Sequence, residues 1–122
     1  MSMYFRDIDY LSHIRDAIAK IQRYLFDKSE TEFMASELVQ DGVIRNLEII
    51  GEAVGKLSPE LKAQHSGVPW LEVSGMRNRL IHGYMSVNLD IVWDTVVKVL
   101  PEFLETVNAL FDALAAEHGK PT

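Results

Sequence analysis

The stretch VIRNLEIIGEAVGKL, residues 43–57, places large apolar side chains three or four positions apart. This spacing puts them on one face of a helix. They are Val43, Leu47, Ile50 and Val54. The pattern starts at about Phe33 and stops near Leu57, so we expect a short lead-in helix followed by a long one.

The same periodicity recurs before this stretch. Residues 7–26 carry an apolar stripe that predicts an amphipathic helix, made of Leu11, Ile14, Ile18, Ile21 and Leu25. After the stretch, Ser58-Pro59-Glu60 has the pattern of an N-cap, a first-turn proline and an acidic first turn. We therefore expect a brief helix there and a loop over residues 64–68.

Two more helices are predicted downstream. One starts at Pro69 and reaches His82, where Gly83 is suited to the left-handed C-cap position. The other is capped by Asn88 and continues as a long apolar stripe. Pro101 falls inside this last helix, so we expect a kink or a break just before it.

Two glycines interrupt the long helix. Gly51 and Gly55 are four residues apart, and each weakens a helix by about 1 kcal/mol relative to alanine. Either they let another backbone come close, or they mark a helix end that loosens before Ser58. Both interpretations stay open at this point.

The composition is that of a folded protein. Of the 122 residues, 48% are hydrophobic and 25% are charged, which excludes disorder as the main state. No segment alternates as a strand does, and no repeat occurs. We expect a single all-α domain over residues 1–122, an antiparallel bundle of four or five helices with its core at about 7–116 and a frayed tail at 117–122.

Charge and cysteine content exclude several classes of protein. The chain has no cysteine, so disulfides, thiolate catalysis and zinc ribbons are ruled out. No apolar run approaches the roughly 20 residues of a membrane span, and the N-terminus lacks an apolar signal segment, so we expect a cytoplasmic protein. A net charge of −6 argues against a broad nucleic-acid-binding surface but allows a local basic pocket.

Common metal and cofactor sites are not predicted. The four histidines show no ligand-pair spacing: His13, His65, His82 and His118. The glycines form no phosphate-cradling loop, and no serine lies in a nucleophile elbow. We therefore expect neither a metal nor a cofactor.

The segment Gly75-Met76-Arg77-Asn78-Arg79-Leu80-Ile81-His82-Gly83-Tyr84 gathers the most chemistry. On a helix, Arg77 and His82 would point about 140° apart, so Arg77 would have to reach round or serve a neighbouring subunit. The negative end of the helix dipole would favour the protonated form of His82.

An Arg and a His suffice for RNA cleavage without a metal. Arg77 would stabilise the extra negative charge on phosphorus, and His82 would serve as general base, general acid or both. The ribose 2′-hydroxyl would be the nucleophile, so DNA would not be cut by this route. The residues alone are equally consistent with a purely structural role, in which His82 caps a carbonyl, Arg77 pairs with an acid and Tyr84 packs on the bundle.

A second polar set lies on the long helix and comprises Arg45, Asn46, Glu48 and Glu52. It is either a solvated face with i to i+4 pairs or, through Arg45 and Glu52 seven residues apart, a group that orients a cleft or pairs subunits. The aromatic residues Trp70 and Trp93 are predicted to be core residues rather than ligand contacts.

At these residues the sequence resembles the HEPN superfamily and, within it, the HepT-like toxins encoded beside a minimal nucleotidyltransferase antitoxin. The family motif is Arg, a polar residue, three further residues, His, one residue and Tyr, matched here from Arg77 to Tyr84. Residues 45–53, Val68-Pro69-Trp70 and Val92-Trp93 also look like this family.

The resemblance implies a helical homodimer in which two motif helices meet at a cleft and form a composite, metal-independent ribonuclease site. It implies Arg77 and His82 as catalytic residues, with Asn78, Arg79 and Tyr84 in support. It also implies an antitoxin that either binds the toxin or adds AMP to Tyr84. The alternative is a non-catalytic helical dimer that binds a nucleotide or the nucleotidyltransferase partner.

Overall fold

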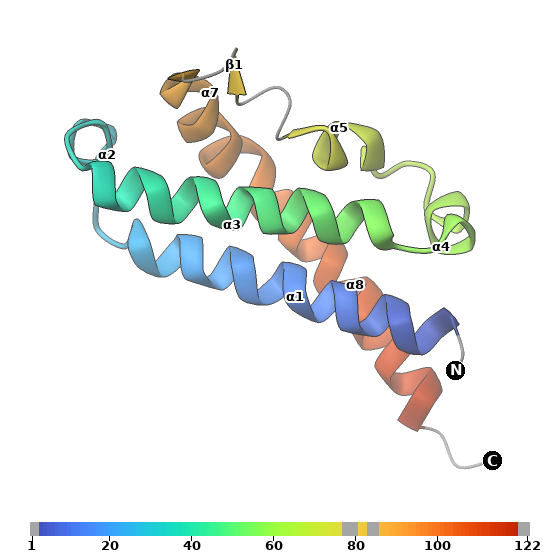
Figure 1. Ribbon diagram of the computed structural model, residues 1–122. Coiled ribbons are helices and arrows are strands. Elements are labelled where there is room, and N and C mark those ends of the chain that lie inside the picture. The colour runs from blue at the N-terminus through green and yellow to red at the C-terminus, as the bar shows by residue number, and fades with distance from the viewer. Residues whose placement is uncertain (1–2, 77–80, 83–85, 120–122) are drawn as a thin grey trace.

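The computed structural model describes residues 3–76, 81–82 and 86–119 and shows an all-α bundle (Figure 1). Helices α1 (Met3–Tyr24) and α3 (Glu37–Lys56) pack antiparallel along most of their lengths. Helix α8 (Leu100–Gly119) packs across α1 and leads to the C-terminus. The predicted all-α class is confirmed.

The core lies where these three helices meet. It contains the two apolar stripes predicted from the sequence, and the fully buried members include Leu11, Ile14, Ile21, Val43, Leu47, Ile50 and Val54. The Arg15 guanidinium lies 4.1 Å from the centre of the Phe111 ring and so joins α1 to α8 at the edge of the core.

Two short helices lie at opposite ends of α3. The lead-in helix α2 (Glu30–Met34) begins with a capping box in which Ser29 and Glu32 exchange hydrogen bonds. Helix α4 (Pro59–Gln64) begins at Ser58, whose hydroxyl accepts a hydrogen bond from the amide of Leu61. Both helices agree with the sequence prediction.

The third predicted helix does not extend to His82, which lies in a strand. Helix α5 (Trp70–Ser74) starts where expected but ends at Gly75, whose amide donates to the carbonyl of Leu71. Gly75 is a poor helix former, which accounts for the end of α5. Met76 is helical again, residues 77–80 lie outside the described residues, and Ile81–His82 form a strand.

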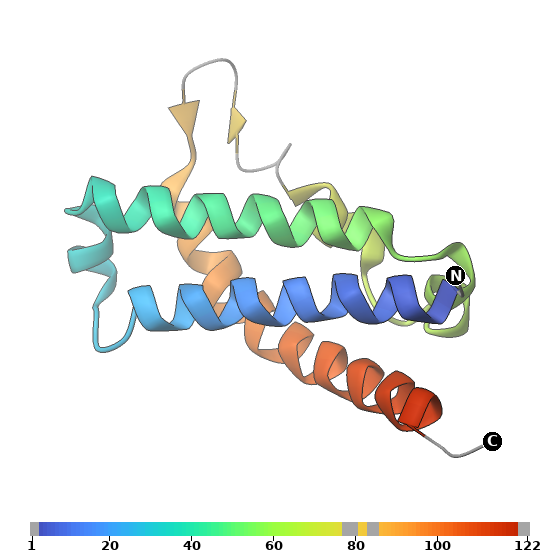
Figure 2. The same ribbon diagram turned by 60° about the horizontal axis from the view of Figure 1, so that its bottom comes forward.

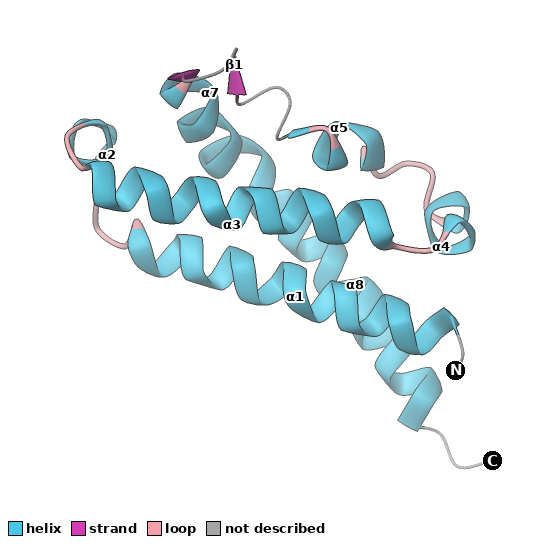
Figure 3. Cartoon of the chain, viewed as in Figure 1, coloured by secondary structure: helices cyan, strands magenta, loops and turns pink. Residues whose placement is uncertain are grey.

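A small hairpin stands where that helix was expected to end. Strand β1 (Ile81–His82) pairs antiparallel with β2 (Ser86–Val87), with Ile81 opposite Val87 and His82 opposite Ser86. Figures 2 and 3 show it on the side of α3 that faces away from α1. The expected C-cap Gly83 lies outside the described residues, and a helical C-cap after His82 is excluded by the strand.

The final helical segment is distorted where the proline predicts it. Asn88 caps α7 (Leu89–Asp94), which runs into a π-helical turn, η1 (Thr95–Val99), and then into α8. The amide of Leu100 donates to the carbonyl of Thr95, five residues back. Pro101 has no N–H and its ring crowds the preceding turn, and the wider π turn relieves that crowding.

The helical periodicity does not predict the hydrogen-bonded link between α1 and the start of α4. The buried carboxylate of Asp7 accepts hydrogen bonds from the Ser58 amide at 2.8 Å and from the Ser58 hydroxyl at 2.6 Å. These two residues are 51 positions apart, so the link fixes the end of α3 to the start of the chain.

We expect Asp7→Ala to lower the free energy of unfolding by about 2 kcal/mol, because it leaves two donors of Ser58 without their acceptor. The exposed Asp9, two residues on, provides the matched control. Urea unfolding followed by circular dichroism compares Asp7→Ala with Asp9→Ala. Equal stability of the two variants would show that the link contributes nothing.

Candidate functional site

The position of the candidate segment depends on a close approach between α3 and α5. A Cβ atom added at Gly51 would lie 3.4 Å from the carbonyl oxygens of both Val73 and Ser74. The absence of a side chain lets the α5 backbone rest on α3. At Gly55 an added Cβ would meet nothing within 4 Å. Close approach is therefore confirmed for Gly51 and not for Gly55.

Both ends of the segment 77–80 are attached to ordered elements. On one side, Met76 is 1% exposed and belongs to the hydrophobic core. On the other side, the backbone of His82 pairs with Ser86 in the hairpin, and the chain then enters the cap at Asn88. Met76 therefore helps to position this segment. We did not predict this role, although an apolar residue directly before Arg77 could have indicated it.

The structure places only part of the predicted site. The backbone of His82 is described, whereas Arg77, Asn78, Arg79 and Tyr84 lie outside the described residues. The strand at His82 removes two arguments made from the sequence. The 140° separation from Arg77 assumed one continuous helix, and so did the helix dipole acting on His82.

The second polar set divides between the core and the surface. Asn46 is 5% exposed and donates from Nδ2 to the carbonyl of Gly42 at 2.8 Å, which makes it an internal part of the bundle. Arg45 is exposed, and Glu48, which also has an interaction partner, is half-buried. Three residues before Gly51, Glu48 lies on the flank of α3 that is nearest α5.

Glu52 lies on the flank of α3 next to α1. Its carboxylate is 3.8 Å from the ammonium of Lys56, an i to i+4 pair on the surface. It also lines a groove of about 230 Å³ between α1 and α3, together with Tyr10 and His13. These contacts support the solvated-face interpretation of Glu52 rather than a role in orienting a cleft.

Both tryptophans are core residues, as predicted. Trp70 is buried, its indole N–H donates to the carbonyl of His65 at 3.0 Å, and its ring meets Phe103 edge-on. Trp93 is packed against the core, with its ring centre 5.5 Å from that of Phe33. Trp70 thus attaches α5 to α8 through Phe103.

Neither a metal site nor a membrane-spanning helix is found within the described ranges. No cluster of three or more His, Asp or Glu side chains there could hold a metal ion. Among the same residues, no helix combines the length and apolar character that crossing a membrane requires.

Comparison with protein families gives one match over most of the chain. Residues 14–110 match the model of the family described as "Ribonuclease HepT-like". The matched region includes α3, α5, the hairpin and η1, and therefore the whole candidate segment. No solved structure matches the chain.

Three relatives show the same kinship. "Gamma-glutamylcyclotransferase and putative RNase MJ0434" of Methanocaldococcus jannaschii is 39% identical over 86% of this chain, which spans about half (47%) of that relative. "Putative RNase TTE0752" of Caldanaerobacter subterraneus is 39% identical over 83% of this chain and 90% of its own length. "Probable ribonuclease HepT" of Thermococcus cleftensis is 38% identical over 76% of this chain and 84% of its own.

We expect Gly51→Leu to push α5 off α3, because the atoms beyond Cβ would overlap the carbonyl oxygens of Val73 and Ser74. The free energy of unfolding should fall by about 1–3 kcal/mol. In a Trp93→Phe background, the emission of Trp70 should shift to the red as the indole meets water.

The matched control is Gly55→Leu, which adds the same side chain one turn further along the same helix. It should leave Trp70 emission unchanged and should not reduce stability, because leucine favours the helix over glycine by about 1 kcal/mol. Identical emission spectra for both variants would contradict the proposed docking of α5.

Proposed function

Because this chain belongs to the HepT-like ribonuclease family, we propose that it is a metal-independent endoribonuclease and the toxin of a toxin–antitoxin pair. The observation that carries the proposal is the family motif from Arg77 to Tyr84, in a segment that starts at buried Met76 and passes through the hairpin at His82. The RNase names of the relatives support RNA as the substrate class.

The proposed reaction is an internal transfer at phosphorus. The ribose 2′-oxygen attacks the adjacent phosphorus and loses its proton, the bond from phosphorus to the 5′-oxygen breaks, and that oxygen gains a proton. His82 carries out one or both proton transfers. Arg77 donates two parallel hydrogen bonds to the phosphate oxygens and stabilises the pentacovalent state. The products end in a 2′,3′-cyclic phosphate and a 5′-hydroxyl.

The other motif residues assist this chemistry in our proposal. Asn78 orients the scissile phosphate or His82, and Arg79 adds positive charge for RNA binding. Such local charge matters in a chain whose net charge is −6, because the rest of the surface does not attract RNA.

We further propose that the site is completed by a second copy of the chain. The similarity to the HEPN superfamily supports a homodimer in which Arg77 of one protomer acts with His82 of its partner. Arg45 and Glu48 on α3 are candidates for the surrounding surface, since Glu48 lies on the α5 flank of that helix. The location of the protein in this account is the cytoplasm, where its RNA substrate is made.

Neutralisation would come from a minimal nucleotidyltransferase antitoxin, by binding or by transfer of AMP to Tyr84. The tyrosine oxygen would attack the α-phosphorus of ATP and release pyrophosphate, leaving AMP on the side chain. The added phosphate would compete with RNA for Arg77, and the nucleoside would block access to His82.

The protein should cleave a mixed RNA pool in excess chelator, whereas Arg77→Ala and His82→Ala should each reduce the rate by at least about 100-fold. Both variants should keep the circular dichroism spectrum of the parent. End analysis of the products should find 2′,3′-cyclic phosphates.

A DNA strand of the same sequence provides the control substrate, because it lacks the 2′-hydroxyl and should stay intact. Full activity of a folded His82→Ala protein would exclude the assigned role. Failure of the parent to cut RNA, combined with saturable nucleotide binding, would favour the non-catalytic binding module.

Incubation with the nucleotidyltransferase and ATP should raise the mass of the protein by one or more AMP units, the first on Tyr84. Peptide mass spectrometry locates the modification, and Tyr84→Phe should remove it because no acceptor oxygen remains at that position. Modification that persists in Tyr84→Phe at its original level would place the acceptor elsewhere.

A further inference from the structure

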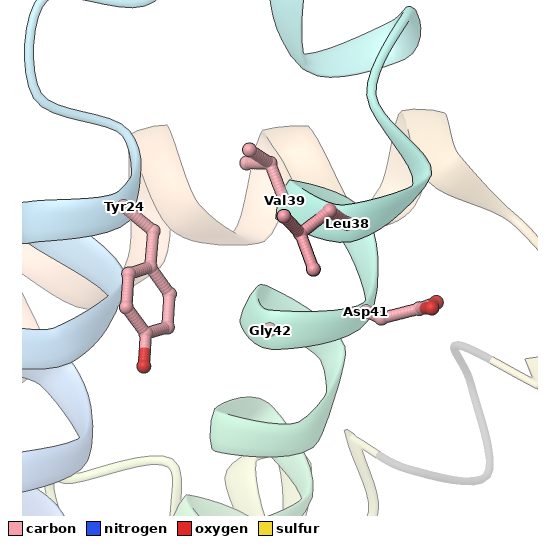
Figure 4. A pocket seen from close by; sticks show the side chains of 5 residues that line it. All are labelled: Tyr24, Leu38, Val39, Asp41 and Gly42. Carbon is pink, nitrogen blue, oxygen red and sulfur yellow. The ribbon is translucent and has the colours of Figure 1, made fainter.

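An apolar groove opens where α1 ends and α3 begins, more than two turns of α3 before Gly51 (Figure 4). Its volume is about 610 Å³, and it is lined by Tyr24, Leu38, Val39, Asp41 and Gly42. A pocket of this size accommodates a small ligand or several side chains of a partner. Leu38 at its edge is 84% exposed. Phe26, two residues after Tyr24, is 80% exposed.

The wall of the groove depends on a glycine. A Cβ atom added at Gly42 would lie 3.1 Å from two ring carbons of Tyr24, so any larger residue would require the ring to shift by a few tenths of an ångström. Figure 4 shows the Tyr24 ring beside the turn of α3 that carries Gly42, with Leu38 and Val39 on the first turn of that helix. The groove is therefore a built feature of the contact between α1 and α3.

The segment around the groove is held in place by side-chain hydrogen bonds. The amide of Gln40 donates to the carbonyls of both Phe33 and Met34 at 3.0 Å, which ties α2 to α3. The Ser36 hydroxyl caps α3 through the amide of Val39. Exposed apolar groups on a preorganised scaffold lose little entropy on binding, which favours recognition.

The surroundings of the groove are acidic. Residues 27–41 contain five acids and one base, all exposed: Asp27, Glu30, Glu32, Glu37 and Asp41, with Lys28. The stretch has a net charge of −4 and stays negative when the neighbouring Arg23 and Arg45 are included. The amide and then the hydroxyl of Ser29 donate to Glu32 and lower its pKa, so this acid is ionised at neutral pH.

We propose that this groove docks an amphipathic, basic segment of a partner protein, with an apolar side chain seated against Leu38 and Tyr24 and lysines or arginines facing the acidic stretch. The combination of an apolar centre with a rim of one charge is typical of helix-in-groove recognition. This inference rests on the groove alone and does not depend on the proposed ribonuclease activity.

The charge also disfavours other occupants. RNA and anionic lipid would bring phosphates against the five acids. A second copy seated on this face about a two-fold axis would bring one acidic stretch against the other. A basic protein segment is the class of occupant that satisfies both the apolar and the charged part of the surface.

The test uses a labelled synthetic helical peptide with leucines at i, i+3, i+4 and i+7 and lysines elsewhere, titrated with the full-length protein by fluorescence anisotropy. Saturable binding is expected, and Leu38→Ser should weaken it by about tenfold or more. Leu71→Ser, a change at an 87% exposed leucine on α5, should leave the affinity within about twofold of the parent.

The charge requirement is tested with a peptide that has glutamates in place of the lysines, and with Glu37→Lys/Asp41→Lys. Both changes should weaken binding by about tenfold, and salt should do the same to the parent. Absence of saturable binding, equal losses in Leu38→Ser and Leu71→Ser, or equal affinity for the acidic peptide would overturn the proposal. A fall in sedimentation coefficient caused by Leu38→Ser would assign the groove to a second copy instead.

Discussion

The close approach of α5 to α3 at Gly51 is the constraint on which the candidate site depends. A Cβ atom at Gly51 would already be in contact with the carbonyl oxygens of Val73 and Ser74 at 3.4 Å, so a bulky side chain would push against them. Trp70, about one turn before these carbonyls, packs edge-on against Phe103 and so attaches α5 to α8 as well. These contacts hold α5 against α3 and α8, and Met76, the residue before Arg77, is buried in the core.

The return of the chain is fixed just as firmly. The hairpin sets the backbone of His82 opposite Ser86, and Asn88 then starts α7 with two hydrogen bonds to its first turn. The π-helical turn before Pro101 keeps α7 and α8 in one continuous, bent helical segment despite the missing N–H of the proline. Attachment at both ends lowers the entropy that the chain between Met76 and Ile81 loses on adopting a single geometry.

Helical periodicity predicted most of the fold because each long helix has one apolar face that must be buried. The stripes of α1 and α3, the caps at Ser58 and Asn88 and the distortion before Pro101 all follow from local chemistry. Local chemistry did not predict the strand at His82. The strand depends on pairing with Ser86, and such pairing is set by the two segments together and not by either one alone.

The candidate site was readable for a different reason. Arg77, His82 and Tyr84 stand at spacings that a family resemblance could match, and family membership then followed from comparison. Asn46 misled the sequence interpretation because a polar side chain on a helix is expected at the surface, whereas its amide is buried and bonded to Gly42. Burial of this kind depends on the packing of α1 against α3, which no pattern within α3 reveals.

The proposed ribonuclease activity requires Arg77 and His82 to act together at one site shared by two protomers. The most direct measurement co-expresses Arg77→Ala and His82→Ala subunits with different tags and isolates the mixed dimer. A composite site predicts about half of the parent's cleavage rate, because one of the two sites regains both residues. A mixed dimer as inactive as either variant alone would contradict the account.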